Sequence, residues 1–254
     1  MKLLLTNDDG IYADGLRALY RAFAPYHEVT VIAPDRERSA VGHGITLHSP
    51  LRCRLIGSDN GMPGYAVNGL PADCVKLGIA EILEHPPDMV VSGINPGANV
   101  GVNVNYSGTV AAAKEAALFG IPAIAVSIAA GDTFHFDDAA RFVKCLADDV
   151  VRNGLDRHTF LNVNFPNLPY ECTRGIRLSR QGLELFSESF DKRLDPRNQV
   201  YYWQGGEPPL SYQHSDTDSA VVDQGFISIT PIKCDMTDYK GLEALKQWGL
   251  ESEL

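Results

Sequence analysis

The sequence predicts an α/β protein: a three-layer core with a mainly parallel sheet, followed by a C-terminal arm rich in strand signals. Up to residue 165, short apolar runs alternate with segments of helical periodicity, which is typical of parallel sheets built through right-handed crossovers. The runs are mostly apolar and do not alternate, as in strands buried on both faces. After Pro166, helical periodicity becomes rare and turn-forming residues become frequent.

The elements of the predicted core follow one another in order. Short, mostly apolar runs predict buried strands over residues 2–6, 28–33, 88–92, 123–127 and 160–163. Apolar positions three and four residues apart predict helices over residues 14–23, 71–83, 109–119 and 137–153. Asp14 and Pro71 are suited to begin the first two helices, and Gly120 and Gly154 to end the last two. Apolar and polar residues alternate between Ile45 and Leu55, and this pattern predicts a β-ribbon.

We expect a boundary at residue 166 between this core, residues 1–166, and an extension, residues 167–254, that serves oligomerisation and shapes the ligand pocket. The extension has strand signals at residues 199–203 and 226–230 and a predicted helix over residues 239–247. Its aromatic residues carry more apolar area than a solvated segment leaves exposed; they are Phe186, Phe190, Tyr201, Tyr202, Trp203 and Tyr212. We therefore expect a homodimer or homotetramer, the alternative being that the arm packs on its own sheet.

The composition excludes several classes of protein. Among 254 residues, 32 are acidic and 22 are basic, and the net charge of −10 argues against binding of duplex nucleic acid. The five cysteines include no C-x-x-C pair, so neither a zinc motif nor a disulfide framework is indicated. The apolar run at the N-terminus is too short for a signal peptide, and no later run approaches a membrane span. We expect a soluble, reduced, cytoplasmic protein without membrane partners.

Polar clusters follow three of the predicted strands, where an open parallel sheet binds its ligands. The first cluster contains adjacent carboxylates, Asp8 and Asp9, which repel each other unless a cation lies beside them. Their oxygens suit magnesium, manganese or calcium, although an Asp–Gly turn with a solvated carboxylate is the alternative. In the second cluster, Ser39 offers a neutral oxygen to a metal, unless the segment is only a solvated charged loop. His43 is a candidate general acid, with a structural role as the alternative.

The third cluster, residues 92–109, is too rich in glycine and asparagine for an ordinary strand or helix. Asn95 offers a carbonyl oxygen to a metal or an amide N–H to a phosphate. Ser107, Gly108 and Thr109 begin an alanine-rich helix whose free N–H groups can hold phosphate, although Ser107 or Thr109 could be an N-cap only. The predicted phosphate contacts are Asn95, Gly97, Asn99, Ser107, Gly108 and Thr109.

Several catalytic motifs are absent from the sequence, among them G-x-S-x-G, G-x-x-x-x-G-K-[ST], H-E-x-x-H and G-x-G-x-x-G. Phosphatases that use D-x-D-G after the first strand are a near match. Asn7 stands at the position of their nucleophile, however, and an amide cannot form an acyl phosphate. A water nucleophile activated by a metal is therefore preferred.

Long ordered motifs then resemble those of the SurE family of stationary-phase survival proteins. They are TNDDGIYADGL at 6–16, PDRERSAVGHGITLHSPL at 34–51 and SGINPGANVGVNVNYSGTVAAAKEAALFGIPAIAVS at 92–127, with NVNFPN at 162–167 and SDTDSAVVDQGFISITPI at 215–232. The resemblance spans essentially the whole chain. It implies a Rossmann-like core, oligomerisation through the C-terminal part, and metal-dependent 5′- or 3′-nucleotidase activity, in some relatives also on short polyphosphate.

The resemblance also implies site residues. One divalent cation, Mg²⁺ or Mn²⁺, would be held by Asp8, Asp9, Ser39 and Asn95, with Asp8 and Asp9 as catalytic residues. The sequence departs from the family pattern at Asn103–Val104–Asn105, where relatives often carry an aspartate.

We expect hydrolysis of nucleoside monophosphates. A non-catalytic nucleotide sensor is the alternative, and a flavodoxin-like carrier explains neither Asp8 nor Asp9. Tyr201, Tyr202 and Trp203 could stack on a base, or could simply form the face of a strand.

Overall fold

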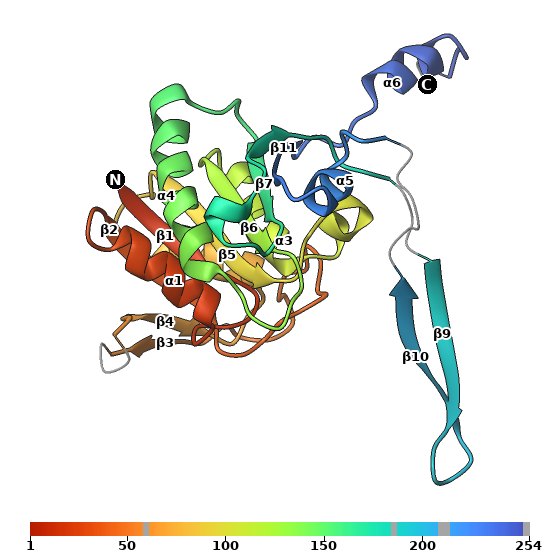
Figure 1. The fold of residues 1–254 in the computed structure, drawn as a ribbon, viewed down its shortest axis with the longest axis horizontal. Coiled ribbons are helices and arrows are strands. Elements are labelled where there is room, and N and C mark those ends of the chain that lie inside the picture. The colour runs from red at the N-terminus through yellow and green to blue at the C-terminus, as the bar shows by residue number, and fades with distance from the viewer. Residues whose placement is uncertain (58–60, 184–186, 208–213, 251–254) are drawn as a thin grey trace.

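A computed structural model describes residues 1–57, 61–183, 187–207 and 214–250 of the chain. It shows a nine-stranded sheet between two layers of helices, and a separate two-stranded hairpin that extends away from this body (Figure 1). The strand order in the sheet is β3-β4-β2-β1-β5-β6-β7-β11-β8. The predicted α/β class with a mainly parallel sheet is confirmed.

Five parallel strands form the centre of the sheet, and each was predicted from its apolar run. They are β2 (Glu28–Pro34), β1 (Lys2–Thr6), β5 (Met89–Pro96), β6 (Ala123–Ile128) and β7 (Thr159–Phe165). Strands β6 and β7 are buried along their whole length, because helices cover both faces of the sheet. The chain passes from β1 outward to β2 and later returns to β5 on the other side of β1, so the strand order reverses between β1 and β5.

Each face of the sheet carries a pair of helices and its own apolar core. Helices α1 (Asp14–Phe23) and α4 (Phe136–Asn153) pack on one face, and α2 (Pro71–Leu77) and α3 (Gly108–Leu118) on the other. Alanines line α3 and let it lie close to the sheet. Helix α2 begins at Pro71 as predicted and continues into a π-helical turn, Gly78–Ile82. Asp14 lies in the first turn of α1 and is not its N-cap, which is Ala13.

The prediction of a β-ribbon between Ile45 and Leu55 is mostly wrong. Only β3 (Cys53–Ile56) forms there, and it pairs with β4 (Gly64–Val67). Residues 45–52 form no strand, because the Thr46 amide and hydroxyl are both bound to the Asp73 carboxylate, which directs this segment across α2.

The chain after residue 166 contributes both to the sheet and to two projecting elements. Strand β11 (Ile227–Lys233) lies between β7, to which it is antiparallel, and the short edge strand β8 (Ile176–Leu178). The later predicted strand therefore returns to its own sheet. Hairpin β9 (Ser187–Leu194) and β10 (Val200–Glu207) and helix α6 (Tyr239–Lys246) extend from the body, whereas α5 (Asp218–Asp223) packs against it (Figure 1). Single 3₁₀ turns lie at Gly101–Asn105 and Tyr170–Cys172.

Phe186 and Tyr212, two of the aromatic residues expected to form an interface, lie outside the described residues. Within the ranges that the structure describes, no helix is both long enough and apolar enough to span a membrane.

Candidate active site

A cavity of about 760 Å³ opens at the carboxyl edge of the sheet, where the strand order reverses between β1 and β5. Open parallel sheets bind their ligands at this kind of position, because the loops from neighbouring strands diverge there. The three predicted polar clusters meet in the cavity. Its described lining consists of Asp8, Asp9, Glu37, Ser39, Ala40, Asn95, Pro96, Ala98, Asn99, Asn103, Tyr106, Ser107 and Gln204.

The turn after β1 places the two aspartates. Asn7 is fully buried and closes the turn on itself: its side-chain amide donates to the Gly10 carbonyl at 3.0 Å, and the Gly10 amide donates to Asn7 Oδ1 at 3.2 Å. Gly10 adopts a φ of +101°, which an L-residue rarely reaches. Asn7 therefore shapes the loop from which Asp8 and Asp9 point into the cavity.

Asp8 is held in place by the first turn of α3. The Thr109 hydroxyl donates a short hydrogen bond to Asp8 Oδ1, and both side chains are buried. Burial raises the pKa of Asp8, and the hydrogen bond from Thr109 opposes this shift. Gly108 leaves room for the contact, because a Cβ at this position would lie 2.8 Å from the Asp8 Cβ.

Asp9 has a buried oxygen without a partner. Its Oδ2 atom makes no hydrogen bond, which is costly for a carboxylate. Burial, then the charges of Asp8 and Glu37, raise the pKa of Asp9 from 3.8 to about 7. A cation beside Asp8 and Asp9 would compensate the repulsion between the carboxylates and favour their charged forms, so the donor set fits a hard divalent cation.

Ser39 enters the cavity on the loop after β2. Its hydroxyl donates to Glu37 Oε1 at 2.7 Å, and the Arg38 amide donates to the Asp8 carbonyl at 2.7 Å. The loop is therefore attached to the backbone of the first cluster. Glu37 adds a third carboxylate to the cavity, and the described lining contains no lysine, arginine or histidine. A phosphate could enter such an acidic site only together with a cation.

Asn95 and Asn99 come from the glycine-rich segment after β5. The Asn95 side-chain amide donates to the Gly97 carbonyl at 2.6 Å, so its Oδ1 atom is left available to a ligand. Asn99 is fixed by strands β6 and β7: its side-chain amide donates to Ser127 Oγ at 2.8 Å, and its backbone amide donates to Asn164 Oδ1 at 2.8 Å. The buried side chain of Asn162 donates to the Asn99 carbonyl at 2.8 Å.

Ser107 is the N-cap of α3, because its Oγ accepts from the Val110 amide at 3.1 Å. It also lines the cavity, so the cap and a ligand-binding role are compatible. The other predicted phosphate contacts differ in placement. Asn95 and Asn99 line the cavity, whereas Gly97, Gly108 and Thr109 are not among its described lining residues, and the Thr109 hydroxyl donates to Asp8.

Seven lining residues were not predicted as site residues, and four of them have polar side chains: Glu37, Asn103, Tyr106 and Gln204. Glu37 and Asn103 lie inside motifs already singled out. Gln204 comes from β10. The aromatic residues just before it, Tyr201, Tyr202 and Trp203, were predicted as possible stacking partners for a base, and all three are exposed. Side chains alternate along a strand, so Trp203 lies on the face opposite to Gln204, whereas Tyr202 shares the face of Gln204.

The fold and this cavity define an α/β protein with an acidic, oxygen-lined site at the carboxyl edge of its sheet. A family model described as Survival protein SurE matches residues 3–188. The chain therefore belongs to the SurE family, and two of its relatives are named 5′-nucleotidase SurE. That of Desulfatibacillum aliphaticivorans is 55% identical over 99% of both chains, and that of Syntrophobacter fumaroxidans is 48% identical over 98% of this chain and all of the relative.

The crystal structure of the SurE protein from Aquifex aeolicus has the same fold. It superposes with a TM-score of 0.87 at 40% sequence identity, covering 98% of this chain and 100% of that chain. The resemblance noted from the motifs is thus confirmed over the whole length.

Replacing Ser107 by alanine is expected to weaken phosphate binding. The hydroxyl is at the positive end of α3 and within the cavity, and loss of a hydrogen bond to a charged group costs about 1.5–3 kcal/mol. The measurement is the inhibition constant of inorganic phosphate, together with KM for AMP. Unchanged values for both would leave Ser107 as a helix cap only.

Proposed function

We propose that the chain is a metal-dependent phosphomonoesterase that hydrolyses nucleoside monophosphates to nucleoside and phosphate. The observation that carries this proposal is the pair of adjacent carboxylates, buried Asp8 and half-buried Asp9, with a buried, unpartnered oxygen on Asp9. The names of the relatives support the reaction class. One divalent cation, Mg²⁺ or Mn²⁺, would be held by Asp8, Asp9, Ser39 and Asn95.

The residues of the cavity can divide the reaction between them. When bound, the cation supplies charge that polarises the phosphate and lowers the pKa of a bound water. Ser107 and the first amides of α3 orient the phosphate oxygens, and Asn99, fixed by β6 and β7, borders the same space. Asp8 Oδ1 already accepts from Thr109, so Asp9 Oδ2 is the better acceptor for the proton of the attacking water.

Phosphate release tests this function directly. With Mn²⁺ present, the protein should convert AMP into adenosine and phosphate in equal amounts, measured by chromatography and a phosphate assay. A nucleotide sensor using the same cavity would bind AMP without releasing phosphate. Short-chain polyphosphate is a second candidate substrate, since the cavity is larger than one phosphate requires.

We further propose that residues 167–254 mediate self-association into a homodimer or homotetramer. Apolar side chains are exposed on both projecting elements, including Tyr202 and Trp203 on the hairpin and Leu242 and Leu245 on α6. No residue of α6 is buried within its own chain. A lone amphipathic helix of eight residues is not stable in water, so α6 needs a surface to pack on.

Replacing both Leu242 and Leu245 by aspartate is expected to dissociate the oligomer, because buried unpaired carboxylates are strongly unfavourable in an apolar interface. Multi-angle light scattering of the wild-type chain and the double variant measures this. A monomeric wild type at micromolar concentration would contradict self-association. An oligomer that persists in the variant would place the interface elsewhere.

The cytoplasm is the proposed compartment. All five cysteines are free thiols, and Cys53, Cys145 and Cys172 are exposed, which suits a reducing environment.

A further inference from the structure

The loop that carries Ser39 has little internal structure of its own. Between the end of β2 at Pro34 and the start of β3 at Cys53, the chain forms neither helix nor strand. Ala40 has a φ of +55° and Gly42 a φ of +56°, so the loop bends sharply just after Ser39. Because no ladder of backbone hydrogen bonds fixes this loop, its position depends on contacts with other parts of the molecule.

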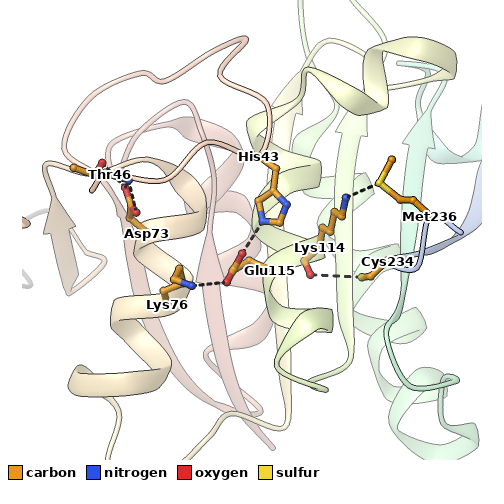
Figure 2. Close-up of polar contacts among 8 residues, drawn as sticks. All are labelled: His43, Thr46, Asp73, Lys76, Lys114, Glu115, Cys234 and Met236. Atoms are coloured by element: carbon orange, nitrogen blue, oxygen red, sulfur yellow. Dashed lines mark hydrogen bonds and ion pairs between the residues drawn. The ribbon is translucent and has the colours of Figure 1, made fainter. Parts of the chain in front are cut away.

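Those contacts lie on both sides of Ser39. Before it, the Arg38 amide donates to the Asp8 carbonyl at 2.7 Å. After it, the Gly42 amide donates to the Tyr106 carbonyl at 2.8 Å, and His43 Nε2 lies 2.6 Å from Glu115 Oε2 (Figure 2). The contact between His43 and Glu115 attaches the loop to α3 through side chains that can carry opposite charges.

Glu115 is an unusual residue for its position. It lies on the alanine-rich helix α3, and only 7% of its side chain is exposed. Burial would raise the pKa of Glu115, but hydrogen bonds from His43 and Lys76 outweigh this effect and hold the pKa below its ordinary value. Lys76 Nζ, on α2, donates to the second carboxylate oxygen at 3.2 Å (Figure 2). A buried carboxylate is tolerated only when it is paired, so the partners of Glu115 are held firmly.

Helix α3 therefore holds two of the proposed metal ligands at once. Near its start, Thr109 donates to Asp8, and farther along, Glu115 holds the loop that carries Ser39. We propose that His43 is a positioning residue: through Glu115 it fixes Ser39 relative to Asp8 and so sets the affinity of the site for a divalent cation. This inference rests on the proposed function, in which Ser39 is a metal ligand.

Mn²⁺ binding to the full chain in the absence of substrate tests the proposal, measured by isothermal titration calorimetry. His43→Ala should raise the Kd for Mn²⁺ about tenfold, as loss of a residue that supports metal ligands commonly does. At saturating Mn²⁺, kcat with AMP should stay within about twofold of the wild type, because no group of the cavity is removed. His43→Gln, whose amide can still donate to Glu115, should recover part of the lost affinity.

Lys76→Met provides the matched control. Lys76 contacts the same Glu115 carboxylate but lies on α2, and among the described residues no hydrogen bond or ion pair joins it to the Ser39 loop, so Mn²⁺ affinity should be unchanged. Equal Mn²⁺ affinity in His43→Ala and the wild type would overturn the proposal. An equal loss of Mn²⁺ affinity in Lys76→Met would also overturn the proposal, because any change in the pairing of the buried Glu115 carboxylate would then have the same effect.

Two further outcomes keep the tests separate. If His43→Ala does not fold, Glu115→Gln replaces it and should weaken Mn²⁺ binding in the same direction; unchanged affinity would again overturn the proposal. A wild type that binds no Mn²⁺ but folds normally would overturn the proposed function itself, and the role of His43 with it.

Discussion

Removal of divalent cations is expected to abolish phosphate release from AMP, and addition of Mg²⁺ or Mn²⁺ should restore it. The described lining of the cavity contains three carboxylates, Asp8, Asp9 and Glu37, and no cationic side chain. Without a cation, an AMP phosphate would meet uncompensated negative charge in a partly dehydrated cavity, and neither binding nor attack by water would be favourable.

The experiment compares enzyme dialysed against EDTA with the same sample after metal is added back. Added Mn²⁺ should also raise the melting temperature of the dialysed protein, because a ligand that binds only the folded state stabilises it. Wild-type turnover in protein shown by elemental analysis to be free of metal would contradict the metal-dependent mechanism.

Asp9→Asn is expected to cause the largest loss among single substitutions. The change keeps the shape of the side chain but removes one of two adjacent charges, and loss of one partner of a buried ion pair costs about 3–5 kcal/mol, or more than two orders of magnitude in Kd. Ser39→Ala removes a neutral oxygen and should be partly rescued by excess Mn²⁺. The measurement is the activation constant for Mn²⁺ in each variant.

The order of these two effects is what tests the assignment. A Ser39→Ala enzyme that is inactive at saturating Mn²⁺, beside an Asp9→Asn enzyme of nearly normal activity, would show that the ligand roles are wrong.

Asp9→Asn should also stabilise the protein when no metal is present. The pKa of Asp9 is about 7 in the folded chain, above its ordinary 3.8, so ionising it opposes folding. This destabilisation is absent below about pH 4, grows between pH 4 and 7, and is complete above pH 7. Metal-free Asp9→Asn should therefore melt at a higher temperature than the wild type at pH 8, with the difference vanishing near pH 4.

Much of the core could be predicted from the sequence because buried parallel strands are mostly apolar runs. Strands β1, β2, β5, β6 and β7 all carry this signal, and the topology that follows places three loops on one edge. Asp8, Asp9, Ser39, Asn95 and Asn99 were found by that reasoning, and the structure brings all of them to one cavity. Their proposed roles toward a metal and phosphate stay predictions.

What the sequence could not predict depends on contacts between distant segments. Strand β9 carries charged residues on a hairpin that no core covers, so its pattern resembles a loop. Asn162 and Asn164 are polar residues inside a buried strand, and only the path of residues 97–99 explains them. The partnership of His43 with Glu115, 72 positions later, is likewise invisible in local sequence.

The placement of β11 has a consequence for the order of events during synthesis. Within the described ranges, strand β8 pairs with β11 alone, so residues 176–178 leave the ribosome about fifty residues before their partner, residues 227–229. The sheet through β7 can form while translation continues, but its β7 edge stays open until residues 227–233 are made. Ribosomes stalled between these two points should carry a nascent chain that is more sensitive to protease and more prone to aggregate than the finished protein.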